Sequence, residues 1–464
     1  MPSQSSALLA GAGQVDITPP AGTHLSGDIA RHRPARLVLD PLYAKAVVLE
    51  AEGRRVGILA LDVTIVTADC TARIREAACA RLGISEDALM VHATQSHSAP
   101  SLGRFMLDPA FDDVIPPDAE WVSGCEKAYA DWAVGRAVEA LEAAAASLEP
   151  VDVGVASAID GRWAHNRRAV RNDGTVAMPG PLRDNPLGPT WIRYLEGPID
   201  PEVGVVALRR RSGRLLALLL NYGCHPVHVF PSLLVSADWP GAWAEEVRRR
   251  LGHDCLPIVL NGPCGNVNPW NPYDPYYRND HRCMGRGLAD TTAKVLQTLE
   301  FSPVATLDWC VSCLPIPVRE VEEERLAWAR RVLEESPAPR WADDAHASVD
   351  WDWMIAASVH GVHLLREREG TVDYEIQVLR IEDTALVGLP GEPFAELGLA
   401  VKMASPARRT YIAHCTSHYV GYIPTPEAFP RGGHECETRY WAKLVPEAYD
   451  LILSRTNQVL RRIF

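Results

Sequence analysis

The chain has 464 residues, of which 47% are hydrophobic and 23% charged. This is the composition of an ordinary globular protein, and it excludes a disordered chain or a small disulfide- or zinc-stabilised scaffold. The formal net charge of −13 has the wrong sign for a protein that binds nucleic acid by neutralising phosphates.

The N-terminus, the cysteines and the apolar segments indicate a cytoplasmic protein. The first twenty residues lack a basic segment, and their apolar run is too short for a secretion signal. The 11 cysteines have no framework spacing, which favours free thiols in a reducing compartment. The longest apolar stretch, around Leu215 to Leu220, is far shorter than the roughly 20 residues that span a bilayer, so we expect no stable membrane insertion. An acidic chain of this kind is compatible with a homo-oligomer.

Aliphatic and β-branched runs predict strands, and apolar residues at i, i+3, i+4 spacing predict helices between them. The predicted strands are Tyr43–Glu50, Val56–Asp62, Leu89–Thr94, Val151–Val155, Gly204–Leu208, Leu215–Asn221, Pro257–Leu260, Tyr374–Ile381 and Ala385–Leu389. The predicted helices are Thr71–Leu82, Gly124–Leu148, Gly241–Leu251, Gly285–Leu299, Arg319–Glu335 and Pro393–Met403. This alternation predicts an α/β or mixed α+β fold, with mixed sheets flanked by helices in one large domain over residues 1–464.

Two segments depart from the alternation. Residues from about 319 to 365 begin as a charged helix and continue as a turn rich in Pro, Ala and Asp, which predicts a helical insertion because strands resume after it. The segment Asn172–Ile199 is rich in Pro and Gly and predicts a long loop. Long loops inside compact domains are often binding loops.

Polar residues gather where predicted strands end, while the common nucleotide-binding and serine-hydrolase motifs are absent. Gln95 and His97 follow the strand Leu89–Thr94, and His225 follows the strand Leu215–Asn221. Ligands of open α/β sheets bind beyond the carboxyl ends of the strands, so these side chains are candidates for a site. The plain alternative is that each histidine only hydrogen-bonds a loop.

Two later segments carry further candidates. The strand before Asn261 opens into a loop rich in Gly, Asn and Pro that can present amide groups to a developing negative charge. Cys264 in this loop is either a buried thiol or a nucleophile with a histidine as its base. Glu392 lies at a strand-to-helix junction. Segment 417–435 contains Tyr, His, Glu and Arg residues, which indicates a metal site, a polar-substrate site or a surface turn.

Nine segments of the chain, in order and spacing, resemble the catalytic domain of the neutral/alkaline, non-lysosomal ceramidases. They are Gly11–Pro20, Ala60–Asp62, Thr94–Pro100, Asn166–Arg167, Tyr222–Pro226, Val235–Asp238, Asn261–Pro269, Leu389–Phe394 and Tyr419–Gly433. The resemblance spans nearly the whole chain. It implies the fold of that catalytic domain, without the family's C-terminal immunoglobulin-like module, and a zinc ion that activates water to cleave an amide bond.

The resemblance implies a set of metal ligands. His225, Glu392 and Tyr422 match a zinc histidine, the zinc glutamate and the zinc tyrosine of the family. Gln95 stands where the family has its other zinc histidine. Because glutamine is a hard, neutral ligand, the site is expected to hold zinc weakly or to prefer another divalent cation.

The resemblance also implies catalytic residues. His97 matches a substrate-contacting histidine, and His434 stands where the family has a tyrosine of the substrate site. We expect one of these two histidines to act as general acid/base. Arg167 matches an arginine that would anchor the substrate or stabilise an oxyanion, and Asn268 replaces the family's catalytic serine.

These expectations describe a metal-dependent hydrolase that cleaves an amide bond of a small soluble or acylated substrate. Asp62 and Asp238 are expected to orient the metal-binding histidine. Two alternatives stay open, since a fold does not fix a function. In the first alternative, the scaffold acts on an ester, lactone or sugar-derived substrate or performs non-hydrolytic acid/base chemistry. In the second, it is a metal-free pseudoenzyme or binding protein.

Overall fold

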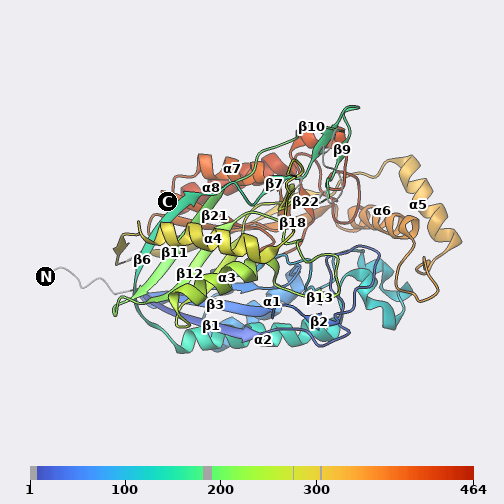
Figure 1. Ribbon diagram of the computed structural model, residues 1–464. Helices are drawn as coiled ribbons and strands as arrows, with labels where there is room; N and C mark the ends of the chain where they lie inside the picture. The colour runs from blue at the N-terminus through green and yellow to red at the C-terminus, as the bar shows by residue number, and fades with distance from the viewer. Residues whose placement is uncertain (1–7, 181–190, 275, 304–305) are drawn as a thin grey trace.

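The first strand of the chain lies inside the largest sheet, whose order is β14-β12-β11-β6-β1-β3-β4-β5, with β16 beside β6 (Figure 1). The computed structural model describes residues 8–180, 191–274, 276–303 and 306–464. The strands of this sheet are β1 (Leu9–Asp16), β3 (Tyr43–Ala51), β4 (Arg54–Leu61), β5 (Leu89–Ala93), β6 (Glu149–Ile159), β11 (Glu202–Arg210), β12 (Leu215–Tyr222), β14 (Leu256–Asn261) and β16 (Phe301–Ser302). The pairs β4/β5 and β12/β14 are parallel, and the other neighbours are antiparallel.

This sheet bends sharply where its two halves meet. Strands β1 and β6 pair only through Leu9 with Pro150 and Ala10 with Glu149. Beyond this short contact the two halves turn toward each other, and apolar residues from both sides, such as Ile58 of β4, belong to one continuous core. Burial of that shared apolar surface is the main stabilising term for the arrangement.

A second sheet, of order β17-β18-β19-β21, packs at the open side of the first. Its strands are β17 (Leu307–Pro317), β18 (Thr371–Ile381), β19 (Thr384–Gly388) and β21 (Arg409–Ala413). The side-chain amide of Asn221 joins the two sheets, because it donates to the carbonyls of Leu260 and Ile412 at 2.7 and 2.9 Å. The backbone N–H of His414 donates to the Asn261 carbonyl at 3.0 Å. The carboxyl ends of β12, β14 and β21 therefore meet at one edge.

Helices cover the outer faces of both sheets (Figure 1). Helix α2 (Lys127–Ala146) packs on β1 and β3 beside α1 (Ala68–Leu82). Helix α3 (Asp238–Leu251) packs on β14, and α4 (His281–Leu296) packs on β6 and β11. Helix α8 (Ala448–Ile463) covers β17 and β18 beside α7 (Ala395–Ala404), which contacts β21.

The remaining elements are short. They are the strands β2 (Leu37–Val38), β7 (His165–Asn166), β8 (Ala169–Arg171), β9 (Val176–Ala177), β10 (Ile192–Leu195), β13 (Leu234–Val235), β15 (Val267–Asn268), β20 (Glu392–Pro393) and β22 (Tyr422–Ile423), and the 3₁₀ helices η1 (Glu86–Ala88), η2 (Pro109–Val114), η3 (Pro117–Ser123) and η4 (Pro426–Arg431). Several of these strands lie at the end of the molecule where the long strands terminate (Figure 1).

The predicted insertion joins two neighbouring strands. Strands β17 and β18 pair along their whole length, and the chain between them forms α5 (Glu323–Glu335) and α6 (Trp351–Arg368). The charged helix is confirmed as α5. The turn predicted after it is partly wrong, because its last residues begin α6, whose apolar residues are buried on nearly all sides and show no one-sided stripe.

The predicted fold class is confirmed, since mixed sheets flanked by helices are present and each predicted strand and helix corresponds to an element. The predicted loop Asn172–Ile199 contains the strands β9 and β10, and its residues 181–190 lie outside the described residues. Among the helices of the described ranges, none combines the length and apolar character needed to cross a bilayer.

The contact between α2 and β1 gives a test of this packing with a matched control. A Cβ added at Gly11 of β1 would overlap the carbonyl oxygen of Ala144 in α2, whereas a Cβ at Gly135 of α2 would meet nothing within 4 Å. Gly11→Ala is expected to lower the free energy of unfolding by about 1–3 kcal/mol, because the backbones must move apart. Gly135→Ala is expected to raise it by roughly 0.5–1 kcal/mol through helix propensity. Urea denaturation measures both, and equal effects of the two changes would contradict the packing.

Candidate active site

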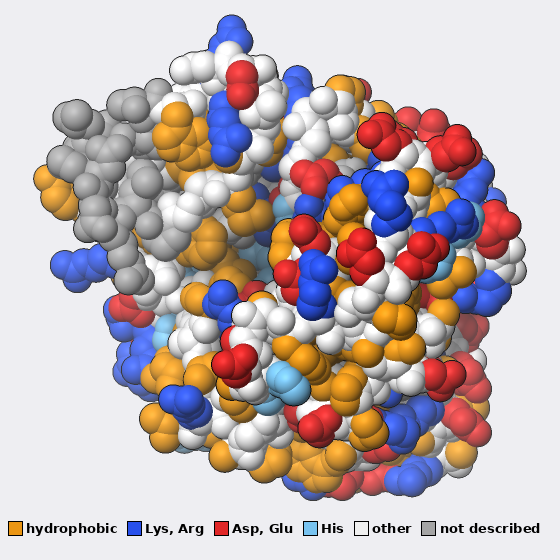
Figure 2. All heavy atoms as spheres, turned by 90° about the vertical axis from the view of Figure 1, so that its right-hand side faces the viewer, with side chains coloured by type: hydrophobic (Ala, Val, Ile, Leu, Met, Phe, Trp, Pro, Cys, Tyr) orange, Lys and Arg blue, Asp and Glu red, His pale blue; other side chains and the backbone are white. Residues whose placement is uncertain are grey.

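A cavity of about 310 Å³ opens where the long strands end. Figure 2 looks onto this end of the molecule and shows a hollow near its centre. The predicted site residues that line the cavity are Gln95, His97, Arg167, Asn268, Glu392, Tyr422 and His434. His225 contacts this set directly, because its Nε2 atom lies 3.0 Å from Oε2 of Glu392. The structure therefore brings together the eight residues that the sequence analysis expected to bind the metal or to act in catalysis.

Two short strand pairs hold four of these segments in register. Strand β20 pairs in parallel with β22, so Glu392 lies opposite Tyr422. Strand β15 pairs antiparallel with β7, which brings Asn268 opposite His165. The next residue after β7, Arg167, donates its backbone N–H to the Asn266 carbonyl at 2.8 Å.

The loop after β5 is held by its neighbours on both sides. The backbone N–H of Gln95 donates to the Val63 carbonyl at 3.0 Å, and that of His97 donates to the Pro226 carbonyl at 3.1 Å. Gln95 has a φ of 69°, in the left-handed region that residues other than glycine seldom adopt. Such strained positions persist only where the surrounding structure enforces them, and they cluster at functional sites.

The contact between His225 and Glu392 needs a cation, a proton or a metal ion, between its two facing atoms. Nδ1 of His225 lies 2.7 Å from the carbonyl oxygen of Cys264 and 3.2 Å from that of Val267, so Nδ1 carries the proton and donates. Nε2 then points a lone pair at Oε2 of Glu392. The pair requires a positive charge between the two atoms, either a second proton or a metal cation.

Glu392 is buried and still ionised. Burial alone would raise the pKa of its carboxyl, but the hydrogen bond and charge of His225 and the charge of Arg167 outweigh that effect and hold the pKa well below its usual range. The hydroxyl of Tyr419 donates to Oε1 of Glu392 at 2.8 Å. Both carboxylate oxygens are therefore engaged, one by a tyrosine and one by a histidine.

Two buried arginines share one buried glutamate beside the cavity. Nε of Arg167 donates to Oε1 of Glu435 at 2.7 Å, and Nη1 of Arg168 donates to Oε2 at 2.8 Å. Burial would raise the pKa of Glu435, but the two guanidinium groups lower it to about 2. Glu435 is thus an anion over the whole physiological pH range, and it fixes Arg167 in place.

Arg167 has one hydrogen-bonding group left over. Its Nη1 donates to the Asn268 side chain at 3.4 Å, and its guanidinium lies 5.4 Å from the centre of the Tyr422 ring. Its Nη2 atom is buried and has no hydrogen-bond partner in the described part of the chain. Because a buried donor without an acceptor is unfavourable, a ligand oxygen in the cavity would complete the set.

The two candidate acid/base histidines are both neutral at physiological pH. Burial lowers the pKa of His97 to about 3 and that of His434 to about 4. Nδ1 of His97 donates to the Gly27 carbonyl at 2.9 Å, which leaves Nε2 free to accept a proton. The His434 ring lies between those of Tyr422 and Trp441, at centroid distances of 5.4 and 6.1 Å.

Of the minor expectations, the buried-thiol alternative for Cys264 agrees with the structure, whereas the roles expected of Asp62 and Asp238 do not. Cys264 is fully buried outside the cavity lining, and burial raises the pKa of its thiol well above the usual value, which disfavours a nucleophilic role. Asp62 pairs with Lys45, and Asp238 pairs with His228. The predicted orientation of His225 by an aspartate is therefore wrong, because backbone carbonyls after β14 do this instead.

The donor types at the site fit a divalent cation, although no three His, Cys, Asp or Glu side chains within the described ranges gather as a metal site. The 3.0 Å separation of His225 Nε2 and Glu392 Oε2 is close to that of two ligands that each lie about 2.0–2.2 Å from one ion. The phenol of Tyr422 and the amide of Gln95 line the same cavity and can complete the set.

Sequence reasoning missed several residues that shape the site. Tyr419 stands three residues before Tyr422 in the same motif, and Glu435 directly follows His434, so both lay beside residues that were singled out. Arg168 likewise follows Arg167. The aromatic wall had no local signal, because its members come from distant segments. They are Phe105, Phe230, Trp270, Trp351 and Trp441.

No protein-family model matches the sequence, and no curated protein matches it. Comparison with solved structures finds the neutral ceramidase from Pseudomonas aeruginosa, with a TM-score of 0.73 over 98% of this chain and 74% of that chain at 17% identity. The chain has the neutral ceramidase fold. A second similar structure, a ceramidase complexed with C2, gives a TM-score of 0.70 over 98% of this chain and 76% of the other, also at 17% identity.

The pairing of Glu435 with two arginines predicts a large effect on stability within this ceramidase fold. Glu435→Ala is expected to lower the free energy of unfolding by about 3–5 kcal/mol, because two buried guanidinium groups lose their counter-charge. Glu435→Gln should lower the free energy of unfolding less than Glu435→Ala does, since its amide oxygen still accepts a hydrogen bond.

The lowered pKa of Glu435 makes the stability of the wild type depend on pH. The ionised carboxylate stabilises the protein above the ordinary pKa of 4.5, and this contribution is lost as the pH falls toward about 2. Urea denaturation from pH 7 to pH 3 should therefore show a steeper loss for wild type than for Glu435→Gln. A Glu435→Ala variant as stable as wild type would refute the assignment.

Proposed function

We propose that the cavity is the active site of a hydrolase that uses a divalent cation, with zinc the first candidate, to cleave an amide bond. The observation that carries the proposal is the 3.0 Å contact between His225 Nε2 and Glu392 Oε2, which a cation bound by both atoms would account for. The fold supports it, because both similar structures are ceramidases by name.

In this proposal His225, Glu392 and Tyr422 hold the cation, with the side-chain oxygen of Gln95 as the fourth ligand. The bound cation would polarise the substrate carbonyl and lower the pKa of a water molecule toward neutrality. Tyr419 keeps one oxygen of Glu392 occupied and so fixes which oxygen faces His225. The carbonyls that accept from Nδ1 of His225 fix the tautomer in which Nε2 is free to bind a metal.

Arg167 supplies positive charge to the substrate. Its guanidinium stays protonated because the negative charges of Glu435 and Glu392 raise its pKa despite the effect of burial. The free Nη2 atom donates to the substrate carbonyl oxygen, where negative charge develops during attack. Glu435 and Asn268 hold the other nitrogens, so the guanidinium needs no rearrangement during the reaction.

His97 moves the proton in this proposal. It is neutral in the resting protein, and its free Nε2 atom faces the cavity. It accepts a proton from the attacking water and passes it to the leaving nitrogen. His434 occupies the opposite wall beside Tyr422, where its neutral ring contacts the substrate.

The size and lining of the cavity favour a small amide or a short acyl chain. Its volume of about 310 Å³ lies at the low end of the roughly 300–1,000 Å³ of small-molecule sites. The aromatic side chains of the wall would exclude water from the reacting bond and bind an apolar acyl group. An ester of similar shape would meet the same groups, so the substrate panel should include matched esters and lactones.

One observation favours a second candidate, a binding protein without a metal. A proton on Nε2 of His225 would satisfy the contact with Glu392 as well as a cation does, and Tyr419 already completes the carboxylate. In that case the cavity would bind a small ligand through Arg167 and perform no hydrolysis. Metal content and turnover separate the two functions.

Metal content and hydrolysis are measured on protein purified without a metal-binding tag. We expect about one zinc or other divalent ion per chain, and hydrolysis of short N-acyl amides that a chelator abolishes and added metal restores. Glu392→Ala and His225→Ala should lose both the metal and the activity, because each removes a ligand atom. Asn268 lines the same cavity but is not a proposed metal ligand, so the Asn268→Ala variant should keep the ion. Metal content unchanged in both ligand variants, or a wild type that cannot be loaded, would overturn the proposal.

Gln95 allows a gain-of-affinity test. Gln95→His is expected to tighten zinc binding at least about tenfold, because imidazole is a better zinc ligand than an amide oxygen. Histidine also tolerates the left-handed backbone found at this position. Competition with a zinc-binding dye measures the affinity. An unchanged affinity would place Gln95 outside the ligand set.

A further inference from the structure

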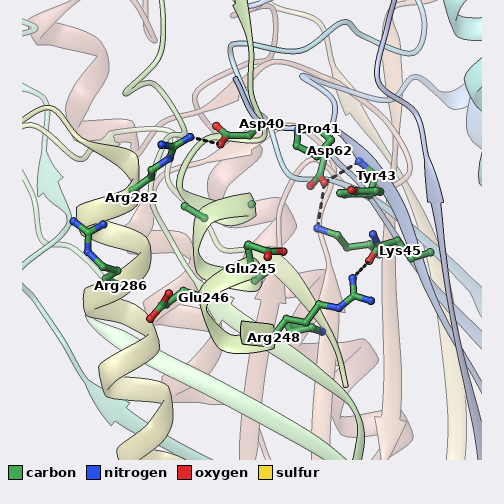
Figure 3. A pocket seen from close by; sticks show the side chains of 15 residues that line it. Asp40, Pro41, Tyr43, Lys45, Asp62, Glu245, Glu246, Arg248, Arg282 and Arg286 are labelled. Atoms are coloured by element: carbon green, nitrogen blue, oxygen red, sulfur yellow. Dashed lines mark hydrogen bonds and ion pairs between the residues drawn. The ribbon is translucent and has the colours of Figure 1, made fainter. Parts of the chain in front are cut away.

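A second and larger cavity, of about 510 Å³, lies between helices α3 and α4 and strands β1 and β3 (Figure 3). It shares no lining residue with the candidate active site. Its wall along α3 includes Gly241, Ala242 and Ala244, small residues that leave space that larger side chains would fill.

A buried lysine at this cavity has hydrogen-bonding capacity that the protein leaves unused. Lys45 is only 6% exposed, and its ammonium carries three N–H donors. Within the described ranges it makes one hydrogen bond, to Oδ2 of Asp62 at 3.2 Å. Two donors of a buried cation at a cavity wall therefore need an acceptor from water or from a ligand.

Most of the acidic side chains of the cavity are already neutralised by the protein. Three of its four carboxylates form ion pairs. The pairs are Asp62 with Lys45 at 3.2 Å, Asp40 with Arg282 at 3.1 Å, and Glu246 with Arg249 and Arg250, both at 2.8 Å. Their charge is therefore not free to repel an anionic ligand.

Two cations and one anion of the lining remain. Arg248 donates to the Gln14 side chain at 3.2 Å and has no ion pair in the described part of the chain. Arg286 comes no nearer than 4.0 Å to its partner, Asp280. Glu245 is exposed and, among the described residues, makes no hydrogen bond or ion pair. Arg248, the weakly paired Arg286 and the two unused donors of Lys45 are thus available to an anionic group, and Glu245 is available to a cationic one.

The positions of these charges define the complement that a ligand must have. In Figure 3, Glu245 lies between Arg248 with Lys45 on one side and Arg286 with Arg282 on the other. Reading across the cavity, the order of charge is positive, negative, positive. A ligand whose charged groups follow the order negative, positive, negative would place an opposite charge beside each of these three.

We propose that this cavity binds an amino acid with two carboxylates, held by Lys45 and Arg248 at one end, by the arginines of α4 at the other, and by Glu245 at its ammonium group. Arginine suits carboxylates because its planar donor fork matches two carboxylate oxygens. The long, exposed side chains of Arg282 and Arg286 can follow ligands of different length. Glu245 distinguishes the amino acid from a plain dicarboxylate.

Isothermal titration calorimetry with L-glutamate and with glutarate tests this proposal on the full chain. Glutarate has the two carboxylates but lacks the ammonium group. L-Glutamate is expected to bind saturably with about one site per chain, and at least about tenfold more tightly than glutarate, the usual effect of one charged hydrogen bond. No saturable binding of L-glutamate, or equal affinity for both molecules, would overturn the proposal.

Single substitutions assign each end of the ligand. Arg248→Gln should lower the affinity for both molecules about tenfold, because both lose a partner for one carboxylate. Glu245→Gln should lower the affinity for L-glutamate alone, so that the cavity no longer binds L-glutamate more tightly than glutarate. Lys294→Gln is the matched control, since Lys294 is exposed on α4 and does not line the cavity, and the affinities of this variant should equal those of wild type. Circular dichroism verifies that each variant is folded. Wild-type affinities in folded Arg248→Gln and Glu245→Gln would refute the assignment.

Discussion

The site is organised around one buried negative charge. A carboxylate in the protein interior normally takes up a proton unless positive charge and hydrogen bonds compensate it. Glu392 stays ionised because His225 and Arg167 lie close to it and Tyr419 donates to it. Each of these groups is then fixed in turn, His225 by backbone carbonyls and Arg167 by Glu435. The geometry of the cavity wall follows from keeping that one charge in place.

Much of the fold, and the list of site residues, could be predicted because both depend on local patterns. The six residues of β14 form a continuous apolar run, and all of them are buried. Polar residues that directly follow such strands, such as His97 and His225, are carried to the same end of the molecule by the sheet itself. The positions of Glu392 and Tyr422 follow from the resemblance, and a short parallel strand pair places them side by side.

What could not be predicted depends on contacts between distant segments. Helix α6 has no polar face to reveal it, because it is enclosed by the rest of the protein. Helix α8 lies outside the predicted elements although its buried residues recur at helical spacing. Tyr419 and Tyr422 look equivalent in the sequence, and only the turns around them, with Ser417 and Gly421 at positive φ, direct Tyr419 to Glu392. The shared counter-ion Glu435 lies in a segment that the sequence singled out, but nothing local indicates that it pairs with Arg167 and Arg168.

That shared counter-ion also sets an order of events during synthesis. Arg167 and Glu435 are 268 residues apart in the chain. At a translation rate of about 5–20 residues per second, Arg167 is added to the chain roughly 13–54 s before its partner. During this interval only water solvates the guanidinium groups of Arg167 and Arg168 on the side that Glu435 later fills. This wall of the cavity therefore closes late, after the strands that support it have been made, and a nascent chain that stalls before residue 435 exposes two arginines that the finished protein buries.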